Sequence, residues 1–201
     1  MKTRLIFAVC FLIAFSFLNF NYENEYRNER QNRWLDYYKM KIESFIDTTI
    51  IENAKQFEYV YENFEEPNEL FNEFFIYSPD SLCYLDLDSY SLILKKANDN
   101  SLIVSGTDVD SEVGLVKIKE KQKLRIHFCG TVCWVEEAEW TDNENIKLFG
   151  FSKITEIEVP TIWTYNLKTK EKKSIQAKII VKNAPGSYLK NVRMKGIEFE
   201  D

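Results

Sequence analysis

The chain has few of the residues on which several common kinds of active site depend. It holds one histidine, six glycines and four cysteines among 201 residues. A Ser-His-acid hydrolase needs a histidine beside its nucleophile, and no Gly-x-Ser-x-Gly turn is present. The scarcity of glycine leaves little room for a loop that wraps a phosphate. We therefore find no catalytic or cofactor motif, and we expect no bound cofactor and no enzymatic activity.

Strong charge of one sign is also missing. The net charge of −6 is weakly acidic. A protein that binds nucleic acid usually carries a basic patch that neutralises phosphates. We therefore expect no nucleic-acid partner.

Long apolar runs are rare, and the one that is present stands at the very start. Lys2 and Arg4 lead into a run over residues 5–18, which is typical of a secretion signal. Cleavage after Ser16 would make residues 1–16 the signal peptide. The alternatives are an uncleaved membrane anchor over residues 5–20, shorter than the roughly 20 residues of a spanning helix, and a buried core helix. We expect export to the periplasm or cell surface, with membrane contact only through this segment if it is retained.

The rest of the chain divides by its hydrophobic pattern. Residues 21–31 are almost wholly polar, which predicts a spacer over residues 17–32 or a solvated helix. Apolar residues then recur at steps of three and four, which predicts a helical segment over residues 33–78. This segment would hold three helices, over residues 34–46, 57–64 and 67–76.

From residue 81 the pattern changes to short apolar strands separated by polar turns, which predicts an antiparallel β domain over residues 81–201. The cadence of its hairpins resembles the blades of a β-propeller, in rhythm only, over roughly residues 82–180. No blade signature recurs at a fixed period, and a closed propeller needs a longer chain. The predicted fold class is therefore α+β: N-terminal helices packed on an antiparallel β-meander, as an open sheet or small sandwich with blade-like hairpins.

Three cysteines remain once Cys10 is assigned to the leader, and they allow three pairings. In an oxidising compartment a pair is expected to form a disulfide. Cys129 and Cys133 are the nearest pair in sequence, and Gly130 between them allows a tight turn. We predict the Cys129–Cys133 disulfide, with Cys83 left over.

His127 stands beside this turn, so a metal site is an alternative interpretation. A histidine and two thiolates suit zinc or copper, and Glu136 or Glu137 could complete four ligands. However, bridged cysteines are not thiolates, and the spacing does not match a familiar zinc pattern. Strict alternation along this strand would also put His127 on the solvent face, opposite Ile126 and Phe128. We predict no metal.

The function that these observations favour is a non-enzymatic binding or interaction module of the cell envelope. Its contact surface would lie at the disulfide turn, with Trp134, Trp140 and His127 as candidate binding residues for an envelope protein or glycan. One alternative is a small secreted hydrolase of envelope polymers that uses carboxylates such as Glu137 and Glu139, which share a strand face. Another is a structural protein anchored by residues 5–20.

Overall fold

Antiparallel strands make up most of the regular structure in the computed structural model of this chain. It describes residues 28–46, 55–57, 59–106, 110–178, 181 and 186–200. The predicted leader, residues 1–16, and the first part of the predicted spacer lie outside these ranges. None of the helices in the described ranges is long and apolar enough to cross a bilayer.

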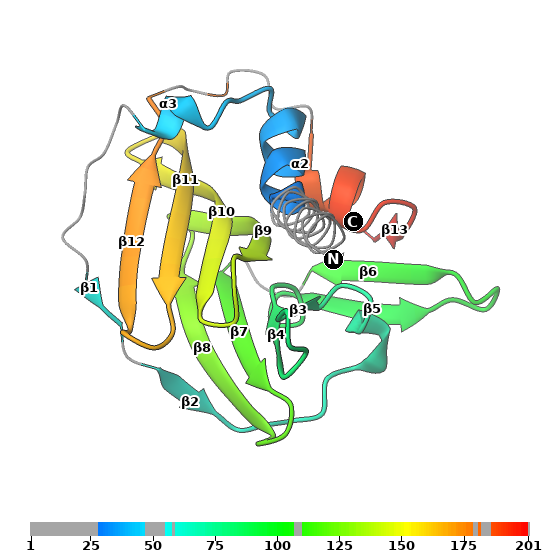
Figure 1. The fold of residues 1–201 in the computed structure, drawn as a ribbon. Coiled ribbons are helices and arrows are strands. Elements are labelled where there is room, and N and C mark those ends of the chain that lie inside the picture. The colour runs from blue at the N-terminus through cyan, green and yellow to red at the C-terminus, as the bar shows by residue number, and fades with distance from the viewer. Residues whose placement is uncertain are drawn as a thin grey trace, which may run out of the picture.

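Two five-stranded sheets form the body of the molecule (Figure 1). In sheet A the strand order is β1 (Lys55–Gln56), β12 (Glu171–Gln176), β11 (Ile157–Asn166), β10 (Asn145–Ile154) and β9 (Cys133–Trp140). In sheet B the order is β2 (Val60–Glu62), β8 (Gln122–Cys129), β7 (Ser111–Lys117), β4 (Cys83–Asp86) and β3 (Ile76–Tyr77). All pairings within both sheets are antiparallel.

The inner faces of the two sheets share one hydrophobic core. Leu85, Leu115 and Leu124 of sheet B and Leu148 and Tyr165 of sheet A are all almost fully buried in it. Two sheets whose inner side chains meet in this way form a sandwich. Of the two predicted arrangements, an open sheet or a small sandwich, the structure has the second.

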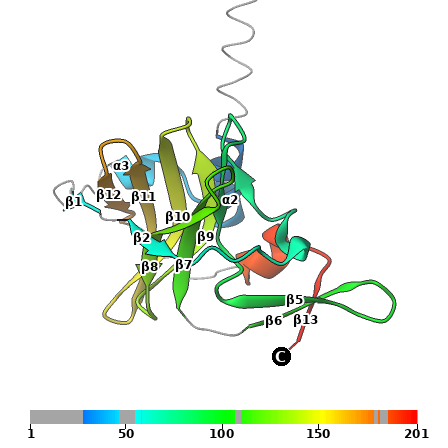
Figure 2. The same ribbon diagram turned by 90° about the horizontal axis from the view of Figure 1, so that it is seen from below.

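The outer face of sheet B is covered as well. A third sheet, of order β13 (Glu198–Phe199), β6 (Leu102–Gly106) and β5 (Leu92–Lys96), packs there with the 3-10 turn η1 (Glu69–Phe71). Figure 2 shows the β5–β6 hairpin reaching out from the body, with β13 beside it. Because both faces of sheet B are covered, the middle of β7 is buried on every residue from Glu112 to Val116 and shows no alternation.

The outer face of sheet A carries the N-terminal helices. Helix α2 (Glu29–Tyr37) lies against β9, and α3 (Glu43–Ile46) lies near β12. Trp34 is fully buried between α2 and β10, where its ring contacts those of Phe149 and Phe151. Tyr188, from the segment that leads into the π-helical turn η2 (Leu189–Arg193), completes this core. Helix α2 begins inside the predicted spacer, so residues 29–32 are part of the folded domain rather than a solvated tether.

The predicted hairpins are confirmed. The helix predicted over residues 34–46 is replaced by two short ones, α2 and α3, and the other two predicted helices are wrong. The pairs β5–β6, β7–β8, β9–β10 and β11–β12 form where polar turns separated apolar runs. Residues 57–64 instead contain β2, an edge strand paired with β8. Residues 67–76 contain η1, started by an Asn68 side chain that accepts a hydrogen bond from Leu70 N, and end at Ile76, the first residue of β3. The chain is thus mostly β with few helices, because pairing with existing strands outweighs weak local helix formation.

Candidate functional site

His127 lies inside the sandwich because β8 contains a β-bulge. Val113 pairs with His127 and the next residue, Gly114, pairs with Arg125, so the register skips Ile126. An extra residue in one strand reverses which side chains face the core beyond it. His127 is therefore only 3% exposed, whereas Phe128 is 44% exposed. The predicted solvent-facing position of His127 is wrong for this reason.

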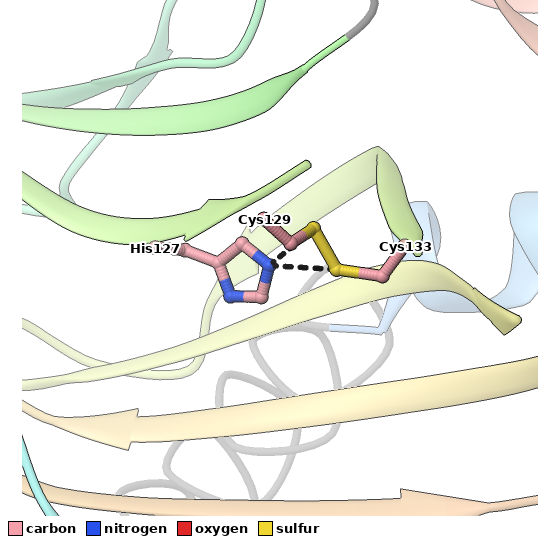
Figure 3. Close-up of side chains that lie close together, drawn as sticks. All are labelled: His127, Cys129 and Cys133. Carbon is pink, nitrogen blue, oxygen red and sulfur yellow. Dashed lines mark hydrogen bonds between the residues drawn. A yellow bond between two sulfur atoms is a disulfide. The ribbon is translucent and has the colours of Figure 1, made fainter. Parts of the chain in front are cut away.

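The bulge brings His127 to the two predicted disulfide cysteines (Figure 3). Cys129 at the end of β8 and Cys133 at the start of β9 are joined as a disulfide, as predicted. The Nε2 atom of His127 lies 3.5 Å from Sγ of Cys129 and 3.6 Å from Sγ of Cys133. On the other side of the ring, Nδ1 shares a hydrogen bond of 2.6 Å with the hydroxyl of Tyr165. The imidazole is thus held between a phenol and two sulfurs.

Burial controls the charge of this histidine. The ring of Trp163 packs edge-on against it at 4.9 Å between centroids. Burial, assisted by the positive charge of Lys172, lowers the pKa of His127 to about 3. The imidazole is neutral at physiological pH.

A second bulge, in β9, controls the face of sheet A that receives helix α2. Glu137 pairs with Phe149 and Val135 pairs with Gly150, so the register skips Glu136. Glu136 and Glu137 consequently both point toward α2, although neighbours in a regular strand face opposite ways. The backbone approaches so closely here that a Cβ on Gly150 would lie 2.0 Å from the carbonyl oxygen of Trp134.

Glu137 is the centre of a buried ion cluster. Its side chain has no exposed surface, and it accepts hydrogen bonds from Arg30 (2.9 Å), Arg33 (2.6 Å) and the Tyr188 hydroxyl (3.1 Å). Burial alone would raise the pKa of this carboxyl. The positive charges of Arg193, Arg30 and Arg33 outweigh burial and lower it, so Glu137 is ionised.

Glu136 is held by neutral donors instead. It accepts hydrogen bonds from the Trp34 indole (2.9 Å), the Tyr38 hydroxyl (2.8 Å) and the Trp134 indole (3.3 Å). Burial raises the pKa of Glu136 despite these three donors. Together the two glutamates tie α2 to β9, which is a structural use of both carboxylates.

Glu137 and Glu139, the carboxylates suggested for a hydrolase, do not line an open cleft, and Asp86 and Asp88 are buried as well. Glu139 is 5% exposed, and its Oε2 accepts from the backbone N of Gln31 at 2.9 Å. Asp86 accepts from the backbone N of Asp88, and Asp88 is paired with Arg193 at 3.0 Å. These carboxylates are buried and each is contacted by a protein donor, whereas Oε1 of Glu139 has no hydrogen-bond partner among the described residues.

The two candidate tryptophans differ in their surroundings. Trp140 is 6% exposed and its indole donates to the carbonyl of Ile76 at 2.8 Å, so it packs in the core. Trp134 is half-buried. One face stacks on Phe151 at 5.3 Å between centroids.

Trp134 also borders a surface cavity, which we call the Trp134 hollow. Its volume is about 410 Å³. It lies where β9, the β4–β5 connection and the η2 turn come together. The described residues that line it are Leu87, Asp88, Ser91, Leu92, Asp110, Ser111, Trp134, Val135, Glu136, Ser187, Leu189 and Arg193.

Sequence reasoning selected Trp134 and His127 as candidates and predicted the disulfide, but it missed the ion cluster around Glu137 and the Asp88–Arg193 ion pair of the hollow. Arg30 and Arg33 are three residues apart, and this spacing on a helix puts both on one face. That signal was available in the sequence. The ion pair between Arg193 and Asp88 could not be predicted from the sequence, because the two residues lie 105 positions apart.

Comparisons with protein-family models, with curated proteins and with solved structures give no match to this chain. The site must therefore be interpreted from its own geometry.

Proposed function

We propose that this chain is an exported, non-enzymatic binding module of the cell envelope, and that its ligand occupies the Trp134 hollow. The observation that carries the proposal is the convergence there of an indole, a buried ion pair and serine hydroxyls. The α+β arrangement, with N-terminal helices on an antiparallel meander, is the scaffold that would hold them. Export is proposed from the leader over residues 1–16, with an anchor over residues 5–20 as the alternative.

The size of the hollow favours a glycan over a protein partner. Pockets for small ligands have volumes of roughly 300–1,000 Å³, whereas a stable protein interface needs roughly 800 Å² on each side. The hollow, at about 410 Å³, matches the first class. A sugar presents apolar C–H groups that suit the Trp134 ring and hydroxyls that suit charged and serine side chains.

The fixed side chains of the hollow support binding more than turnover. Asp88 and Arg193, both almost fully buried, neutralise each other and offer oriented polar atoms. The Trp34 indole donates to Oε2 of Glu136 and the Tyr38 hydroxyl lies 2.8 Å from both carboxyl oxygens, so this carboxyl is already held by protein groups. A carboxylate hydrolase needs an acid that is free to protonate the leaving group.

Calorimetric titration with soluble fragments of cell-envelope glycans tests the proposal. We expect a glycan that binds the wild-type chain and binds the variants Trp134→Ala and Ser187→Trp at least 10-fold more weakly. Ser187 is exposed at the rim, so the second variant fills the hollow without altering the core. Tyr61→Ala is the matched control, because Tyr61 is 65% exposed on β2 and does not line the hollow.

The proposal fails if no fragment binds, or if both hollow variants bind like the wild type. Release of cleaved sugars by the wild type, lost in Glu136→Gln or Glu137→Gln, would instead establish the hydrolase alternative.

A further inference from the structure

Three metal-ligating side chains converge at the disulfide turn, and the proposed glycan site does not use them. His127 Nε2, Cys129 Sγ and Cys133 Sγ all lie within 4.8 Å of one another. They come from the end of β8 and the start of β9, on either side of a three-residue turn. We propose that, when the Cys129–Cys133 disulfide is reduced, these three side chains bind one Zn²⁺ ion.

The positions of the three atoms match a tetrahedral zinc site. Zinc–nitrogen and zinc–sulfur bonds of about 2.0 and 2.3 Å, at the tetrahedral angle, put each sulfur about 3.5 Å from the nitrogen. The two nitrogen–sulfur distances here are 3.5 and 3.6 Å. The same geometry puts the two sulfurs about 3.8 Å apart, so zinc binding requires the two sulfurs to move away from each other.

The turn between the cysteines can accommodate that separation. Thr131 and Val132 are exposed, so the turn is not packed into the core. The strands on either side stay fixed by their pairing with β7 and β10. Movement of the sulfurs therefore needs rotation of side chains and the turn rather than of a sheet.

The surroundings of His127 are those of a metal-ligating imidazole. A ligating histidine usually has its second ring nitrogen held by a hydrogen bond, which fixes the ring toward the metal. Here the Tyr165 hydroxyl shares a hydrogen bond with Nδ1. The Nε2 atom faces the two sulfurs (Figure 3). Within the described ranges no carboxylate joins the cluster, so the fourth zinc position would hold water or an external ligand.

The redox step balances with a dithiol reductant. The dithiol gives two electrons and two protons to the disulfide, becomes a disulfide itself and leaves Cys129 and Cys133 as thiols. Zn²⁺ then replaces the two thiol protons, which are released, and the metal keeps its oxidation state. Oxidation of the thiols by another disulfide reverses the sequence and expels the ion. Disulfide formation and zinc binding are thus mutually exclusive states of one site.

The experiment uses the full chain carrying Cys83→Ser, which removes the other cysteine of the described ranges. The protein is reduced with dithiothreitol, freed of it by anaerobic gel filtration and titrated with Co²⁺, then with Zn²⁺. We expect one ion per chain, with the thiolate charge-transfer and tetrahedral bands of Co²⁺, and none in the oxidised protein. The Cys129→Ser and Cys133→Ser variants should each weaken binding at least 100-fold.

Tyr165→Phe supplies a milder test that keeps the packing of the ring. Loss of its hydrogen bond to His127 should weaken Zn²⁺ binding about 10-fold or more. Circular dichroism of the reduced, metal-free variants reports whether they are folded. The proposal is overturned if the reduced chain takes up no ion, or if Cys129→Ser and Cys133→Ser bind as tightly as their parent. Glycan binding by the oxidised protein is measured separately, so either proposal can fail alone.

Discussion

The β7–β8 and β9–β10 hairpins contain the same backbone feature with opposite chemical results. Each has a β-bulge next to a glycine of the partner strand, Gly114 in one and Gly150 in the other. The first bulge turns a neutral His127 into the core between the sheets. The second turns Glu136 outward, beside Glu137, where α2 supplies donors. A bulge thus selects which side of a sheet receives a polar group, and the layer that covers this side supplies the groups that hold it.

The two bulges differ most in how closely the backbones approach. We predict that Gly150→Ala lowers the free energy of unfolding by more than about 4 kcal/mol, because its Cβ would collide with backbone at 2.0 Å. Gly114→Ala should cost roughly 1 kcal/mol, since the one close neighbour of the new Cβ would be the flexible end of Lys123, and Asp86 Cβ would lie at an ordinary contact distance. Urea unfolding followed by tryptophan fluorescence measures both.

Gly106→Ala is the control for this series, because the methyl group that it adds would meet nothing within 4 Å. Equal losses of stability at Gly150 and Gly106 would contradict the tight packing of the second bulge.

The charged cluster around Glu137, on the outer face of sheet A, should contribute more to the free energy of unfolding than any ion pair on the surface. Glu137→Gln removes the negative charge that Arg30 and Arg33 face, and we expect a loss of about 2 kcal/mol in the free energy of unfolding. Both arginines are partly solvated, which limits the loss. Glu156→Gln is the matched control, since Glu156 is 91% exposed in its pair with Lys153 and should change stability by less than about 0.5 kcal/mol. Similar effects of the two substitutions would argue against the cluster as the clamp on α2.

The neutral histidine inside the sandwich should make the oxidised protein sensitive to mild acid. Unfolded His127 gains a proton as the pH falls through 6.5, whereas the folded chain resists protonation until about pH 3. Between these values the unfolded state binds more protons, so stability decreases as the pH falls. The expected loss from pH 7 to pH 5 is about 2 kcal/mol.

Urea unfolding of the oxidised wild type and of His127→Phe, both with a chelator present, isolates this contribution. The carboxylates titrate in both proteins, so their contribution to the pH dependence of stability cancels when the two proteins are compared. An identical pH dependence of the two chains would show that His127 is not a buried neutral group.

Among Gly150→Ala, Glu137→Gln and Trp140→Phe, the smallest loss of stability is expected for Trp140→Phe. Comparing it with Trp134→Ala separates the roles of the two tryptophans of β9. Trp140→Phe removes the donor to the Ile76 carbonyl, and we expect a loss of roughly 1 to 2 kcal/mol with no change in glycan affinity. Trp134→Ala should instead act on glycan affinity. Calorimetry and urea unfolding of both variants provide the comparison, and a loss of affinity in Trp140→Phe would place the contact surface elsewhere.

Much of the sheet structure was predictable because hairpins are local. Alternating apolar strands and polar turns specify neighbouring antiparallel pairs. The polar turn that joins β5 to β6 contains Asn100 at a positive φ of 66°. The aromatic spacing of residues 57–76 was misleading. Phe71 and Phe75 are buried beneath the β5–β6 hairpin without needing a helix.

The hairpins, the disulfide partners and the turn that joins them follow from the amino-acid sequence alone, because each depends on residues a few positions apart. The directions in which His127 and Glu136 point follow only from the packed strands, because a bulge is set by the register against the opposite strand. The same is true of the contacts of Glu137 with Arg30 and Arg33, more than 100 residues away. Such contacts depend on how two layers pack, and no periodicity within one strand encodes that packing.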